Sequence, residues 1–76
     1  MTREEFTSRM LSLTSKQEHL EQEISNFEDM LKKMPANTVL GRLCIKGYLK
    51  RDKAALVRVK EKIEKLRMEY EKTQLD

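Results

Sequence analysis

Apolar residues recur at alternating intervals of four and three along two long stretches of the chain. The first stretch has one polar exception, Gln17, and its apolar members are Phe6, Met10, Leu13, Leu20, Ile24, Phe27, Leu31 and Met34. The second stretch has Asp52 as its exception, and its apolar members are Ile45, Leu49, Leu56, Val59, Ile63, Leu66 and Tyr70. This spacing places one apolar stripe on each of two helices and is typical of helices that pack lengthwise. The repeat predicts an all-α fold, and we call the two stripes together the seam.

Local signals indicate where these helices begin and end. Thr2 and Glu5 have the spacing of a capping box, in which Thr2 accepts a hydrogen bond from the backbone N–H of Glu5. Pro35 lacks a backbone N–H and disfavours helical geometry at the residue before it, so the first helix should end there. Asn37 or Thr38 is suited to cap the second helix.

The connection between the expected helices is short. We expect a first helix over about residues 3–34, an apolar tip over 35–41 and a second helix over about 39–73. Short connections make antiparallel neighbours, so residues 1–76 are predicted to form one helical-hairpin domain, a two-helix antiparallel coiled coil. Chains this small bury a low fraction of their surface. We therefore expect the hairpin to assemble into a four-helix or larger bundle.

Charge supports the antiparallel hairpin. Residues 1–34 carry five basic and seven acidic side chains, whereas residues 35–76 carry eleven and six, so the two helices attract each other. The expected register sets Phe6 near Tyr70 and Phe27 near Leu49. On one side of the seam it also sets two glutamates opposite two lysines, as Glu28–Lys46 and Glu21–Lys53.

The middle of the chain allows an alternative. Gly41 and Gly47 each cost a helix about 1 kcal/mol relative to alanine. The segment TVLGRLCIKGYL, residues 38–49, could instead form a small β-hairpin, with a shorter second helix starting at Asp52. A helix, an apolar glycine-bearing hairpin and a basic helix in this order loosely resemble a β-type prefoldin subunit. The resemblance covers about a dozen residues without a diagnostic motif, and it implies a chaperone function.

Several classes of protein are disfavoured. Cys44 is the single cysteine, which excludes an intramolecular disulfide and a disulfide-stapled scaffold. The longest apolar run, Ala54–Val57, is far shorter than the roughly 18 residues of a membrane span. The first residues do not resemble a signal peptide. We expect an intracellular protein, cytoplasmic or nuclear.

The pattern contains no catalytic constellation. His19 is the only histidine, and Glu23 lies one helical turn away, so the pair offers two ligands on a solvated face. A bystander histidine is the better interpretation. We predict no catalytic, metal or cofactor site and no small-molecule substrate, because a two-helix hairpin has no room for a substrate-sized cavity.

The tip is the most apolar part of the chain. Seven residues at or beside it form the predicted partner-binding surface, which we call the tip cluster: Met30, Met34, Val39, Leu40, Leu43, Cys44 and Tyr48. An exposed apolar patch of this kind marks an interface. The alternative is that these side chains bury one another locally at the end of the hairpin.

A basic stripe follows the second helix. Its members repeat every seven residues and form the basic face: Arg51, Arg58, Lys65 and Lys72. Phosphate neutralisation needs only density of charge, so nucleic acid is a possible partner, although residues that read or stack on bases are scarce. The sequence favours a non-enzymatic coiled-coil interaction module (an adaptor, scaffold subunit or oligomerisation domain) that binds a protein or a second copy through the seam and the tip. The alternatives are a basic nucleic-acid-binding or nucleoprotein-assembly domain and a small prefoldin-like or secretion-type chaperone.

Overall fold

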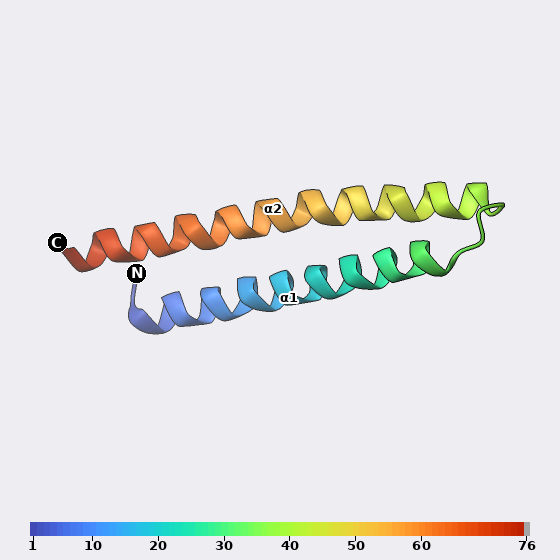
Figure 1. Cartoon of the computed structure of the whole chain (residues 1–76). Helices are drawn as coiled ribbons and strands as arrows, with labels where there is room; N and C mark the ends of the chain where they lie inside the picture. The colour runs from blue at the N-terminus through green and yellow to red at the C-terminus, as the bar shows by residue number, and fades with distance from the viewer. Residues whose placement is uncertain (76) are drawn as a thin grey trace.

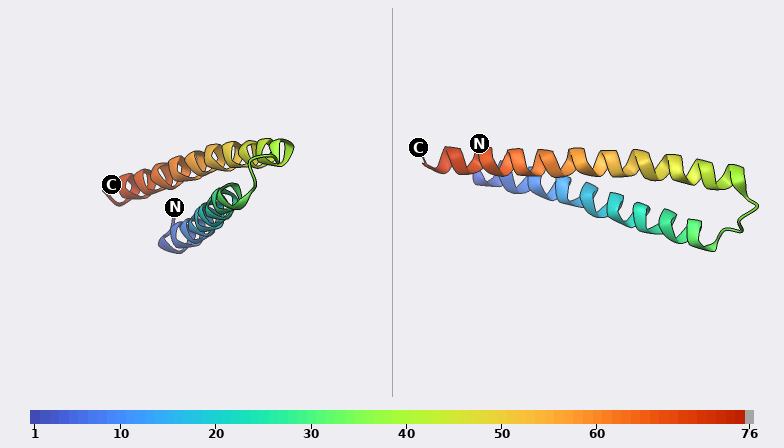
Figure 2. Two further views of the ribbon diagram at one scale, coloured as in Figure 1. Left: turned by 45° about the vertical axis from the view of Figure 1, so that its right-hand side comes forward. Right: turned by 45° about the horizontal axis from the view of Figure 1, so that its top comes forward.

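The chain folds back on itself once, as two long antiparallel helices (Figure 1). The computed structural model describes residues 1–75, with α1 over Arg3–Lys33 and α2 over Val39–Leu75. The start of α1 and the end of α2 lie at one end of a rod 60 Å long, and the turn lies at the other end (Figure 2). The predicted all-α helical hairpin is confirmed. Neither described helix has a stretch long and apolar enough to cross a membrane.

The ends of α1 follow the local signals in the sequence. The backbone N–H of Glu5 donates to Thr2 Oγ1 at 3.2 Å, and Glu4 and Glu5 place negative charge at the positive end of the helix dipole. At the other end Met34 is extended, with ψ of 136°, as expected for the residue before Pro35. Pro35 therefore sets the length of α1.

The start of α2 differs from expectation in detail. Thr38 directly precedes the helix, but its hydroxyl donates backwards to the carbonyl of Pro35 at 2.9 Å. The backbone N–H of Thr38 also donates to that carbonyl, at 3.1 Å. Thr38 thus closes the turn instead of capping α2 through its hydroxyl. Residues 39–49 are helical, so the alternative β-hairpin is not formed.

The buried core consists of seam residues alone. Its apolar members are Ile24 from α1 and four residues of α2, Leu49, Val59, Ile63 and Leu66. Full burial of such a side chain contributes about 1.5–3 kcal/mol. None of these residues is completely enclosed, since each keeps 7–9% of its surface exposed. Two helices cannot cover their own stripes fully.

Stacked aromatic rings lie near both ends of the seam. Phe6 and Tyr70 stack with ring centroids 4.1 Å apart and an interplanar angle of 11°, which confirms the expected register. Near the turn, Phe27 stacks on Tyr48 with centroids 5.7 Å apart. The expected register placed Leu49 beside Phe27. The position along the rod is right, but the ring that stacks on Phe27 comes from Tyr48, the residue next to Leu49, which lies beside the seam.

The ion pair found across the seam joins different residues from the pairs that the sequence predicted. Lys53 Nζ lies 4.0 Å from Glu28 Oε1, and this is the inter-helix ion pair among the described residues. The expected pairs Glu28–Lys46 and Glu21–Lys53 are not formed there. Lysine has a long, flexible stem, and Lys53 reaches along the helix towards the tip instead of straight across.

Both glycines lie inside α2, and neither has a positive φ. A Cβ added at Gly47 would have no atom within 4 Å, whereas one at Gly41 would lie 2.7 Å from Met34 Cε. The space at Gly41 is therefore used by a packed side chain, and the space at Gly47 is open.

Gly47→Ala should raise the free energy of unfolding by about 1 kcal/mol, because alanine favours the helix and nothing obstructs its methyl group. Gly41→Ala is the matched control and should gain less, since the Met34 methyl must move aside. Urea unfolding followed by circular dichroism measures both. A loss of stability in Gly47→Ala would show that residue 47 is not helical in solution.

Candidate interaction site

Five members of the tip cluster point outwards. The exposed fractions are 51% for Met30, 61% for Val39, 80% for Leu40 and 59% for Leu43, and Cys44 is also exposed. Four large apolar side chains that are half exposed or more lie at one end of a narrow rod. The hairpin itself does not bury them.

The other two members pack against the hairpin. Met34 is half-buried against Gly41, and Tyr48 stacks on Phe27 while keeping 45% of its surface exposed. The Arg51 guanidinium lies 5.2 Å from the centroid of the Tyr48 ring, within reach of a cation–π contact. Tyr48 therefore belongs to the side of the hairpin as much as to the tip.

Arg42 holds the two sides of the turn together. Its Nη1 donates to the carbonyls of Leu31 at 3.1 Å and Met34 at 3.3 Å, which lack helical partners at the end of α1. Sequence reasoning missed this role. The signal was present, because a basic side chain near a helix C-terminus commonly binds its last carbonyls.

The basic face has the expected exposure. Arg51, Arg58, Lys65 and Lys72 are all exposed on α2. Arg51 is engaged by Tyr48 and by the carboxylate of Asp52, 3.7 Å from its Nε. The other three form no ion pair with any described residue. The free positive charge of this face therefore lies towards the end of the rod that holds the termini.

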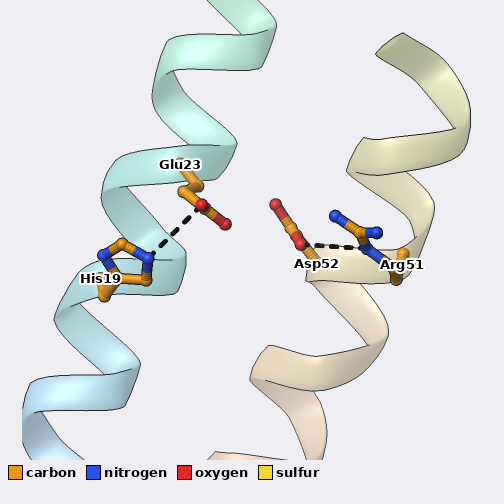
Figure 3. Close-up of polar contacts among 4 residues, drawn as sticks. All are labelled: His19, Glu23, Arg51 and Asp52. Atoms are coloured by element: carbon orange, nitrogen blue, oxygen red, sulfur yellow. Dashed lines mark ion pairs between the residues drawn. The ribbon is translucent and has the colours of Figure 1, made fainter. Parts of the chain in front are cut away.

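Asp52 is the one charged side chain buried in the described part of the seam, with 4% of its surface exposed. Its Oδ2 has no hydrogen-bond partner, and its only close cation is Arg51. Figure 3 shows the Asp52 carboxylate pointing towards α1 and the Glu23 carboxylate pointing back towards it. Two carboxylates thus face each other across the helices.

His19 extends this polar group on α1. Its Nε2 lies 3.4 Å from Glu23 Oε1, and its side chain is 74% exposed (Figure 3). Within residues 1–75, no three metal-ligating side chains come close enough to share an ion. The histidine is a surface neighbour of the glutamate.

The two sides of the seam differ. We call one the charged flank; it carries Glu21, Glu28, Lys46, Lys53, Lys60 and Arg67 at seven-residue intervals. We call the other the open flank; it carries Arg9, Lys16, Glu23 and Met30 from α1, with Tyr48, Ala55, Lys62 and Glu69 from α2. Residues seven apart share one side of a packed helix. Each flank is therefore a continuous strip along the rod.

The open flank contains two shallow apolar grooves. The first, near the middle, has Leu20, Ala55 and Val59 at its base, with Ser15, Lys16 and His19 at its edges. The second, towards the termini, has Leu13 and Leu66 at its base and is edged by Arg9, Ser12, Lys62, Lys65 and Glu69. Small side chains such as Ala55 and Ser12 leave this flank low enough for another helix to approach.

Sequence reasoning also missed three exposed apolar side chains away from the tip. Leu11, Val57 and Met68 expose 64%, 55% and 61% of their surfaces. All three lie outside the seam spacing, and this alone could have identified them as exposed apolar residues. They are separated along the rod, and single exposed apolar residues are normal on a protein surface.

Comparison of the sequence with protein-family models and with curated proteins, and of the structure with solved structures, yields no match. Function must therefore be inferred from the surfaces of the hairpin.

Asp52→Leu should raise the free energy of unfolding of the single chain by about 1–3 kcal/mol, because it removes an unpartnered buried oxygen and completes the apolar seam. Asp29→Leu, at an exposed position of α1, is the matched control and should change stability by less than about 0.5 kcal/mol. Urea unfolding, at a concentration where sedimentation gives the mass of one chain, measures both. If Asp52→Leu destabilises the chain, Asp52 Oδ2 is satisfied in solution.

Proposed function

We propose that this protein is a non-enzymatic interaction module that binds a protein partner through its apolar tip. The observation that carries the proposal is the exposure of Met30, Val39, Leu40 and Leu43 at the turn. A turn that faced only water would be polar. Apolar side chains clustered on a surface favour a protein interface.

The anchoring of the turn supports this function. Arg42 bonds the end of α1, and Thr38 bonds Pro35, so the backbone beneath the exposed side chains is tied at both sides. A preorganised surface loses less conformational entropy on binding than a mobile one. Met30 adds a flexible apolar side chain that adapts to the shape of a partner. The tip combines a fixed frame with an apolar surface.

Nucleic acid is the second candidate. It is favoured by Arg58, Lys65 and Lys72, which are exposed and free of ion pairs with the described residues. The two candidates predict opposite responses to salt, since phosphate contacts weaken steeply as salt rises and apolar contacts do not. We do not propose the prefoldin-like chaperone, because the resemblance depended on a β-hairpin where residues 39–49 form a helix.

The proposal is tested by photo-crosslinking in cells of the source organism. A photoreactive phenylalanine at Leu40 or Leu43 should give a discrete protein adduct, and the same group at Met68 should not. Both sites expose apolar side chains, but only the first two lie at the tip. The adduct should persist when cells are lysed and irradiated in about 0.5 M salt, where contacts to phosphate are screened.

Leu40→Ser combined with Leu43→Ser should abolish an adduct formed from a photoreactive group at Val39 without lowering helicity, because both leucines are exposed in the free hairpin. Circular dichroism of the purified double variant provides the control for folding. Equal adducts from the tip and from Met68, or adducts to nucleic acid alone, would contradict the proposed function.

A further inference from the structure

An acidic site lies where the seam meets the open flank. Asp52, a seam residue, keeps only 4% of its surface exposed, and its Oδ2 has no hydrogen-bond partner. Glu23 lies across from it, and its carboxylate is turned towards Asp52 (Figure 3). Arg51 Nε lies 3.7 Å from Asp52 Oδ1 and supplies one positive charge beside the two carboxylates. In formal charge one negative charge is left over, and a second cation beside Glu23 would balance it.

The levels of residues along the rod show where such a cation is available. Phe6 is level with Tyr70, and Phe27 with Tyr48. A residue of α1 and a residue of α2 therefore lie at the same height along the rod when their residue numbers add to 75 or 76. The middle residue of α1 is 18 and that of α2 is 57, so the two helices are centred at the same level.

Two copies laid tip to tail would thus overlap along their whole length, related by a twofold axis through this central level. Asp52 and Glu23 both lie five residues from the centre on the side of the tip. Lys62 lies five residues from the centre on the side of the termini, and it also belongs to the open flank. At 1.5 Å per residue, Asp52 and Glu23 lie about 7.5 Å from the centre towards the tip, and Lys62 lies about 7.5 Å from the centre towards the termini. The twofold axis exchanges these two levels.

We propose that two copies of the chain associate tip to tail through their open flanks, with Lys62 of each copy paired with Glu23 of the other, beside the buried Asp52. The arrangement is a four-helix antiparallel bundle in which α1 packs beside α1 and α2 beside α2. It contains two equivalent copies of the acidic site, each with a lysine of the partner copy beside Glu23. The interface shares Met30 and Tyr48 with the tip cluster but does not use Leu40 or Leu43, so the inference does not depend on the proposed function.

The apolar part of the open flank fits this pairing. The central groove, with Ala55 and Ser15, lies at the twofold axis, where small residues allow two backbones to approach closely. Tyr48 lies nine residues from the centre, and Leu66 lies nine residues away on the other side. The exposed ring of Tyr48 therefore meets the second groove of the partner copy, whose base includes Leu66. The apolar contacts and the pair of Lys62 with Glu23 coincide in one register, whereas Lys16 lies two residues from the centre of α1 and opposes Lys16 of the partner copy.

The charged flank would not serve in the same way. Its four α2 positions are Lys46, Lys53, Lys60 and Arg67, all basic, so two copies joined there would oppose like charges along α2. Lys60 and Lys62 are both exposed lysines of α2 on opposite flanks. They provide a matched pair of sites for a test.

Sedimentation equilibrium at tens of micromolar should give twice the 9.0 kDa mass of the chain. Lys62→Glu should raise the dissociation constant of the dimer at least tenfold, because the new glutamate then lies beside Glu23 and Asp52 of the other copy. Each of the two equivalent sites in the dimer would hold three carboxylates. Lys60→Glu makes the same charge change on the charged flank and should leave the constant within twofold. Adding Glu23→Lys to Lys62→Glu should recover most of the lost affinity.

Three further results bear on the proposal. Leu40→Ser combined with Leu43→Ser should leave the dimer intact, which separates this interface from the tip. In a Cys44→Ser background, spin labels at Asn37 of the two copies should be separated by a distance approaching the 60 Å length of the rod, because the tips lie at opposite ends. A mass of one chain at tens of micromolar, equal effects of Lys60→Glu and Lys62→Glu, or a short distance between the Asn37 labels would each overturn the proposal.

Discussion

Two aromatic stacks fix how the helices of this protein meet. Phe6 with Tyr70 and Phe27 with Tyr48 lie near opposite ends of the seam, so neither helix can slide without breaking both. A seam of aliphatic residues at seven-residue intervals fits almost as well after a shift of one heptad. Planar rings that must coincide at two levels remove this freedom. All other alignments along the rod, including Asp52 with Glu23, follow from this register.

With the register fixed, the two flanks have different consequences. On the charged flank, Lys53 reaches Glu28, and opposite charges from the two helices face each other. Exposed pairs of this kind contribute little stability, at most about 1 kcal/mol, but they keep that side hydrated. On the open flank, Ala55 and Tyr48 replace lysine at the corresponding positions of α2. The two sides therefore differ mainly in the half near the tip, because Arg9, Lys16, Glu23, Lys62 and Glu69 keep the rest of the open flank charged.

Much of the fold could be predicted from the sequence, and the reasons are local. Seam spacing depends only on 3.6 residues per turn, and Pro35 ends a helix wherever it occurs. The contacts that were not predicted depend on helix rotation and on side-chain reach, which no spacing rule contains. The position of the Tyr48 ring beside the seam and the diagonal reach of Lys53 are of this kind. Arg42 was missed because its partners are carbonyls, which the sequence does not display.

Asp52 shows how far sequence reasoning extends into the site. The spacing identified it as a charged residue within an apolar stripe, but a long stripe often tolerates such a residue at its edge. The structure adds that one oxygen is buried and unpartnered and that Glu23, not a lysine, faces it. A polar residue in a helical seam commonly specifies partner and register at some expense of stability. In the dimer that we propose, Lys62 of the second copy would add a cation beside Glu23, next to this buried carboxylate.

The tip-to-tail dimer that we propose would, together with the apolar tip, have a mechanical consequence. Twofold symmetry places the two tips at opposite ends of a rod about as long as one hairpin, 60 Å. They cannot both reach one small partner, but they can bind two sites on an extended or repeated one. In that case the second contact forms at a high effective concentration set by the rigid spacing, and the combined affinity exceeds that of either tip. A single hairpin lacks this property, so the pairing of Lys62 with Glu23 would convert the apolar tip into a bivalent connector.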